Sequence, residues 1–243
     1  MWFVFALAIV AGTLSGVVGT GSSILLLPVL VGTFGPKEAV PIMALAAILG
    51  NLARMGAWWR QVDWRATLAY ALPGAPAAAL GAHTLLALQA WCIDLLLGVF
   101  FLAMVPARRR LRRARWSLSL AQLALCGAGI GFLTGLVLST GPVSVPVFLA
   151  YGLGGGAFLG TEAASALLLY AGKIGTFAAQ DALPARIVVD GLLVGAGIMA
   201  GTACGKALMT RLPPARIDLA LDALLVLSAA QLLRSAFSVA MLP

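Results

Sequence analysis

Apolar positions run along this chain in long, nearly unbroken stretches. Each stretch reaches or nearly reaches the ~20 residues that a helix needs to cross a bilayer. The stretches cover residues 2–33, 36–58, 66–86, 90–106, 117–151, 154–179, 185–209 and 214–240. The segments between them are too short to fold separately. The pattern predicts an all-α polytopic membrane protein with about eight apolar segments.

Composition supports this class and changes the interpretation of the charge. The chain is 62% apolar and 10% charged, with a mean hydropathy of +1.04, so it has too little polar surface for a soluble domain of 243 residues. Much of the net charge of +8 comes from one run of arginines: Arg108, Arg109, Arg110, Arg112, Arg113 and Arg115. Between two spans, such a loop is typical of a cytoplasmic anchor that touches anionic lipid. We therefore expect the lipid bilayer, and no nucleic acid, as a partner.

Reactive side chains are scattered. Cys92, Cys126 and Cys204 lie singly in apolar runs, without the spacing of a disulfide framework or a zinc site. The sequence contains no recognisable nucleophile triad, paired carboxylates or metal-ligand cluster. We expect a protein that is not an enzyme and has no cofactor or metal.

Glycines interrupt two of the apolar runs, the first before Pro28 and the second before Pro146. In hydrocarbon, an unwound backbone is stable only where it is buried in protein or lines an aqueous cavity. A helix that restarts there would point its free N–H groups, and about half a positive charge, into the cavity, which favours an anion. The residues expected to bind it are Gly19, Thr20, Gly21, Ser22, Ser23, Ser139, Thr140, Gly141 and Ser144. Nearby small-xxx-small stripes have a simpler interpretation as helix packing surfaces: Gly12 and Gly16, Gly131 and Gly135, and Gly197, Gly201 and Gly205.

The two interrupted runs open two similar halves. Gly16 aligns with Gly135, and Arg54 aligns with Lys173. Matched loops carry their basic residues in opposite positions: one half has Arg54, Arg60 and Arg65 where the other has Arg186 with Asp181, and the next loop is basic only in the second half, with Lys206, Arg211 and Arg216. The positive-inside rule predicts this swap for inverted repeats, in which the first run of each half is a Gly-broken or re-entrant helix that turns back at its glycine break. If every apolar run crossed once instead, each half would have four crossings and the two halves would face the same way. We expect a first repeat over residues 1–105, a basic cytoplasmic linker over 106–116 and a second repeat over 117–243, with both termini outside.

Ionisable residues inside spans are candidates for function because burying them is costly. Lys173 and Arg54 could hold the charge of an anion in transit, or could extend to the membrane interface. Asn51, one turn before Arg54, could face the same cavity or form an interhelix hydrogen bond. Glu162 and Asp222 could carry a coupling proton, or could cap or pair structurally.

Several of these features together resemble the TauE/SafE family of probable sulfite exporters. They are the glycine breaks, Pro28 and Pro146, the phrase Gln61-Val62-Asp63-Trp64-Arg65, and the glycine stripes that end at Gly81 and Gly205. The resemblance implies a bacterial inner-membrane carrier for sulfur-containing anions such as sulfite, sulfonates and sulfoacetate. Family members usually have a run of glycines where this chain has Gly21-Ser22-Ser23, and paired glycines where it has Gly141-Pro142.

The resulting hypothesis is a carrier of small anions that works by alternating access at a site in the middle of the membrane. The same lining could form a passive anion channel, and a scaffold that transports nothing would also explain the glycines. A coupling ion, H⁺ or Na⁺, and a homo-oligomeric state are compatible with the sequence.

Overall fold

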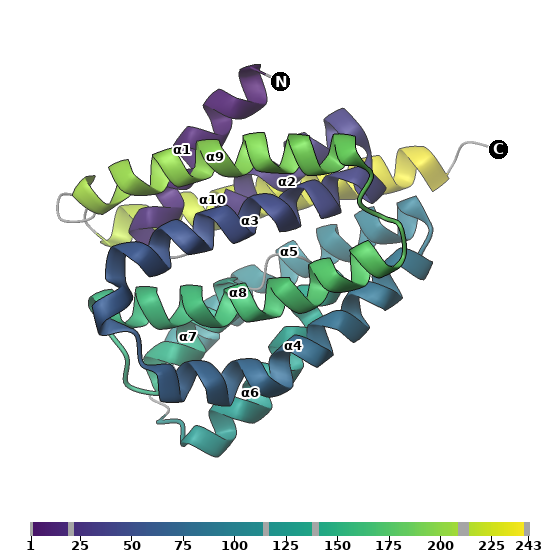
Figure 1. The fold of residues 1–243 in the computed structure, drawn as a ribbon. Coiled ribbons are helices and arrows are strands. Elements are labelled where there is room, and N and C mark those ends of the chain that lie inside the picture. The colour runs from purple at the N-terminus through teal and green to yellow at the C-terminus, as the bar shows by residue number, and fades with distance from the viewer. Residues whose placement is uncertain (1, 19–21, 114–116, 138–140, 209–213, 241–243) are drawn as a thin grey trace.

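The computed structural model describes residues 2–18, 22–113, 117–137, 141–208 and 214–240, and these residues form an assembly of helices (Figure 1). The prediction of an all-α membrane protein is confirmed for this part of the chain. In chain order the helices are α1 (Trp2–Val18), α2 (Ser22–Phe34), α3 (Pro36–Trp58), the 3₁₀ turn η1 (Trp59–Gln61), α4 (Trp64–Ala87), α5 (Ala90–Arg113), α6 (Leu120–Val137), α7 (Gly141–Ala150), α8 (Gly155–Ala179), α9 (Ala185–Leu208) and α10 (Pro214–Ala240).

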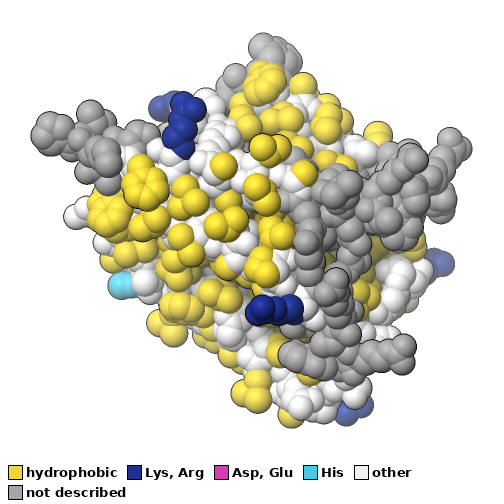
Figure 2. Space-filling model, turned by 180° about the vertical axis from the view of Figure 1, so that it is seen from behind, with side chains coloured by type: hydrophobic (Ala, Val, Ile, Leu, Met, Phe, Trp, Pro, Cys, Tyr) yellow, Lys and Arg dark blue, Asp and Glu magenta, His cyan; other side chains and the backbone are white. Residues whose placement is uncertain are grey.

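Several helices are long and apolar enough to cross a membrane. Within the described residues these are Pro36–Gln61, Ala90–Ala107, Leu120–Val137 and Ala185–Gly205. Apolar side chains cover much of the face shown in Figure 2, and Leu72, Leu80 and Leu125 are each at least 66% exposed. Such a surface fits lipid rather than water. The chain is a multi-pass membrane protein, while the number of about eight crossing segments stays a prediction.

Each glycine-interrupted run forms two helices, as predicted. The first run gives α1 and α2, and the second gives α6 and α7. The residues between these helices, 19–21 and 138–140, lie outside the described part of the chain.

Helix α2 contains Pro28, and α10 compensates for it. Proline has no N–H, so the carbonyl of Ile24 loses its usual intrahelical donor. Ser228 Oγ of α10 donates to this carbonyl at 2.8 Å, and Gln231 Nε2 donates to the carbonyl of Pro28 at 3.0 Å. The order of these contacts shows that α2 and α10 run in the same direction. The carbonyl that Pro28 frees within the membrane is thus paired by a side chain of a neighbouring helix.

Glycine stripes bring pairs of helices into backbone contact. A Cβ atom at Gly201 of α9 would lie 2.0 Å from the carbonyl oxygen of Ile9 in α1. One at Gly135 of α6 would lie 2.1 Å from the carbonyl oxygen of Ala78 in α4. The packing interpretation of the stripes is confirmed, because these approaches leave no room for a side chain.

The packing partners correspond between the halves. Helix α1 packs on α9 while its counterpart α6 packs on α4, and α3 packs on α9 while its counterpart α8 packs on α4. Helices α3 and α8 pack on each other, as do α5 and α10.

The contacts also give the directions of these helices. Ala46 lies against Gly195, and Gly50 lies against Ile198, so α3 and α9 run in the same direction. Arg54 meets Glu162, whereas Trp58 meets Gly156 nearer the start of α8, so α3 and α8 run antiparallel.

One expectation about the linker is wrong in detail. The arginines of residues 106–113, expected in a loop, continue α5 as far as Arg113. Arginine and leucine favour helix, and basic residues at a helix C-terminus interact favourably with its dipole.

Candidate functional site

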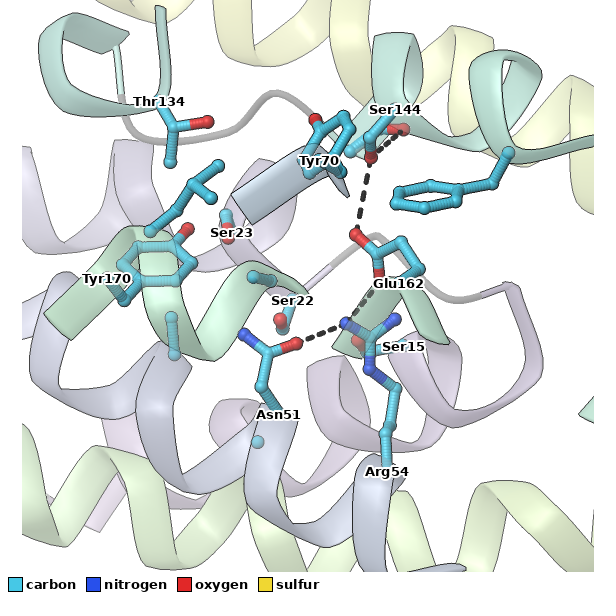
Figure 3. Close-up of a pocket in the computed structure, with 16 residues that line it drawn as sticks. Ser15, Ser22, Ser23, Asn51, Arg54, Tyr70, Thr134, Ser144, Glu162 and Tyr170 are labelled. Atoms are coloured by element: carbon cyan, nitrogen blue, oxygen red, sulfur yellow. Dashed lines mark hydrogen bonds and ion pairs between the residues drawn. The ribbon is translucent and has the colours of Figure 1, made fainter. Parts of the chain in front are cut away.

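A cavity of about 60 Å³ lies where the two halves meet (Figure 3). A water molecule needs roughly 10–15 Å³ measured in this way, so the space suits four to six waters or one small ion. The lining is unusually polar for the interior of a membrane protein. It consists of Ser15, Ser22, Ser23, Ala47, Gly50, Asn51, Arg54, Tyr70, Thr134, Gly141, Ser144, Phe148, Glu162, Ala166, Leu169 and Tyr170.

Two short helices begin at this cavity. Ser22 and Ser23 are the first residues of α2, and Gly141 and Ser144 belong to the first turn of α7. The first four N–H groups of a helix have no intrahelical acceptor, and they carry the positive end of its dipole. Two such ends open to the same space, which is an arrangement suited to negative charge.

A buried ion pair crosses the cavity from one half to the other. Arg54 of α3 places Nη2 2.7 Å from Glu162 Oε2 of α8, and it also donates to Asn51 Oδ1 (Figure 3). Arg54 and Asn51 are three residues apart, so they lie on the same face of α3. Both ions are buried, with Arg54 only 5% exposed, so the alternative that Arg54 extends to the interface does not hold.

Helix α7 contacts the same carboxylate. Ser144 Oγ lies 3.2 Å from Glu162 Oε1 and 3.2 Å from the carbonyl oxygen of Gly141, and it can donate to either. The carboxylate of Glu162 therefore lies between a guanidinium from the first half and the first turn of a short helix from the second half.

Lys173 is buried beside the cavity but does not line it. Its Nζ donates to the carbonyl oxygen of Thr134 at 2.9 Å and lies 5.5 Å from the centre of the Phe177 ring. Thr134 is in the last turn of α6, where carbonyls lack intrahelical donors and the dipole is negative. The structure thus places Lys173 at a helix end, whereas Arg54, its counterpart in the repeat, reaches the cavity.

Half of the residues that the sequence analysis assigned to substrate come together here. Those that line the cavity are Ser22, Ser23, Asn51, Arg54, Gly141 and Ser144. Those that lie outside the described residues are Gly19, Thr20, Gly21, Ser139 and Thr140. The side chain of Asp222, a candidate for the coupling proton, also lies outside that part of the structure.

Sequence reasoning missed several lining residues: Ser15, Tyr70, Thr134, Phe148 and Tyr170. The internal repeat contained a signal for some of them. Ser15 and Thr134 are 119 positions apart, as are Asn51 and Tyr170, and as are Ser22 and Gly141. Equivalent positions of the two halves therefore line one cavity.

The family model for the sulfite exporter TauE/SafE family matches residues 4–232. The chain belongs to the TauE/SafE family. No curated protein and no solved structure matches it. TauE/SafE proteins are membrane transporters and not enzymes, so membership makes this chain a transporter of the anion-exporter type.

Proposed function

We propose that this TauE/SafE protein carries small sulfur-containing anions, such as sulfite and organosulfonates, and binds them in the cavity between α2, α3, α7 and α8. One observation carries the proposal. The N-terminal ends of two short helices and the buried guanidinium of Arg54 all line one space that fits a small ion.

The lining supplies the chemistry that a sulfur oxyanion needs. Oxyanions accept several hydrogen bonds at once, and arginine can donate two parallel bonds to one of them. Backbone N–H groups of α2 and α7 and the hydroxyls of Ser22, Ser23 and Ser144 would add donors without a further buried cation. The residues of the two breaks, Thr20 and Thr140 among them, belong to the same proposed site.

The proposed mechanism is alternating access between two inverted repeats, over residues 1–105 and 117–243. Exchange of the halves preserves the helix partners, and the antiparallel course of α3 and α8 supports inversion. A site between such repeats can open to either side when one repeat rocks against the other. The positive-inside rule then favours cytoplasmic placement of the arginine run at the end of α5 and of the loops on that side, in a bacterial inner membrane.

Purified protein in liposomes tests the proposal. We expect saturable uptake of radiolabelled sulfite or sulfonate, with counterflow when unlabelled anion is preloaded. Arg54→Gln should abolish uptake, whereas Arg60→Gln, at an exposed position of η1, should not. Absence of flux for every sulfur oxyanion would refute the proposal, and flux that neither saturates nor shows counterflow would indicate a channel.

A further inference from the structure

The proposed anion site already contains an anion that belongs to the protein. The carboxylate of Glu162 forms an ion pair with the guanidinium of Arg54 through one oxygen, and Ser144 of α7 can donate a hydrogen bond to the other oxygen. A sulfur oxyanion would bind the same two kinds of donor, a guanidinium and a hydroxyl. Within a cavity of about 60 Å³, the carboxylate of Glu162 and a transported anion cannot both form a close ion pair with the guanidinium of Arg54 at the same time.

Charge balance decides what accompanies the anion. With Glu162 ionised, the pair with Arg54 is neutral, and a bound monoanion would leave one uncompensated negative charge in a low-dielectric space. With a proton on Glu162, the monoanion balances the guanidinium. A protonated carboxyl also donates a hydrogen bond, which can point at an oxyanion instead of repelling it.

From this geometry we infer that Glu162 is the proton-coupling group of the transporter: its carboxylate and the transported anion compete for Arg54, so one proton binds with each anion. The inference rests on the proposed function. The proton binds Glu162 from the side at which the anion arrives. It leaves on the other side when the anion departs and Arg54 pairs with Glu162 again. The gradients of anion and proton set the direction.

The other titratable groups around Glu162 are less suited to this role. Arg54 on α3 is the cation of the pair, and Tyr70 of α4 and Tyr170 of α8, which line the same cavity, carry phenol groups, which are ordinarily neutral at physiological pH. Lys173 of α8 contacts Thr134 and Phe177 and does not line the cavity. From α7 the carboxylate meets the hydroxyl of Ser144, which does not titrate.

Proton flux measured with anion flux tests the inference. Liposomes that contain a pH-sensitive dye would be given methanesulfonate, whose charge does not change over the assay range. We expect wild-type protein to acidify the lumen by about one proton for each anion. In Glu162→Gln, any remaining anion flux should carry no proton and should lose its dependence on pH.

A matched control is Asp94→Asn, which removes another buried carboxylate, on α5, that bonds to Ser235 of α10 outside the cavity. Its ratio of protons to anions should stay that of the wild type. An unchanged ratio in Glu162→Gln would overturn the inference, and so would wild-type flux that carries no proton. If the wild type moves no anion at all, the proposed function fails and this inference fails with it.

A binding measurement on the wild type needs no variant. When one proton is taken up with each anion, the apparent Kd for methanesulfonate weakens by up to about tenfold for each unit rise in pH. An affinity that is constant across the pH range would overturn the inference.

Discussion

At the scale of single residues, the buried ion pair between Arg54 and Glu162 joins the two halves across the cavity. Two charges within a membrane protein are tolerated because each compensates the charge of the other, and Asn51 is a further partner of Arg54 and Ser144 of Glu162. Removal of one partner leaves a buried charge without compensation. The loss of stability that follows the removal of one partner can therefore be measured.

Glu162→Ala should lower the stability of the protein in detergent by about 3–5 kcal/mol, because Arg54 loses its carboxylate partner. Added sulfite or methanesulfonate should restore more stability to this variant than to the wild type, since the anion can take the vacated place. Thermal unfolding with and without anion measures both effects. Glu38→Ala, a carboxylate outside the cavity on α3, is the control. Equal anion effects in Glu162→Ala and wild type would contradict the assignment of Arg54 to the anion.

Lys173→Met should separate structural from binding roles. The variant loses the bond to the Thr134 carbonyl, so we expect a lower unfolding temperature. The cavity lining is retained, so anion affinity should change much less than in Arg54→Gln. Isothermal titration of the purified variants compares the two affinities. A larger loss in Lys173→Met would place the anion beside Lys173 instead.

At the scale of elements, close helix packing holds the short helices in place. Helix α6 lies against α4 along a stripe where backbone touches backbone, and this fixes the point from which α7 departs. On the other side, Ser228 and Gln231 of α10 bond to carbonyls of α2. The positions of the two helix ends thus depend on glycine contacts and on bonds far from the cavity.

Gly135→Ala and Gly129→Ala, both on α6, test this dependence. A Cβ at Gly135 would meet the Ala78 carbonyl at 2.1 Å, whereas one at Gly129 would meet nothing within 4 Å. We expect Gly135→Ala to lose stability and transport together, because α6 must move away from α4. Gly129→Ala should retain both, and alanine stabilises a helix by roughly 0.5–1 kcal/mol relative to glycine. Wild-type behaviour of Gly135→Ala in melting and flux assays would show that the close approach is dispensable.

Much at this scale could be predicted from the sequence, because apolar length and glycine breaks act locally. The division of each long run into two helices followed from such signals, although Ser22 and Gly141, which were expected in the breaks, are the first residues of α2 and α7. The partner of Glu162 did not, since nothing local indicates that α3 and α8 cross at Arg54. The repeat did not predict the partner of Lys173 either. Lys173 and Arg54 are equivalent positions, but they contact different partners because their neighbours differ.

At the scale of the molecule, the site lies where equivalent positions of both halves meet. Pairs such as Ser15 with Thr134 line the cavity together. Both halves thus contribute residues to the lining, as expected for a site at the interface between two repeats. Inverted repeats also require particular loops to lie on the same side of the membrane, so the topology of the chain can be tested.

Single cysteines in a variant without Cys92, Cys126 and Cys204 test the topology. A cysteine at Arg60 and one at Arg211 should both react with an impermeant reagent from the cytoplasmic side. One at Asp181, between α8 and α9, should react from the outside. Labelling of Arg60→Cys and Arg211→Cys from opposite sides would contradict inverted repeats.

The most direct test is to locate the anion itself. Selenate or selenite is a heavier analogue of a sulfur oxyanion, and selenium can be located in a crystal by its anomalous scattering. We expect a selenium peak between the first turns of α2 and α7, within hydrogen-bonding distance of Arg54, with Glu162 displaced from the guanidinium. A peak elsewhere in the protein, or a soaked crystal in which Glu162 still holds Arg54 and the cavity contains no selenium, would contradict it.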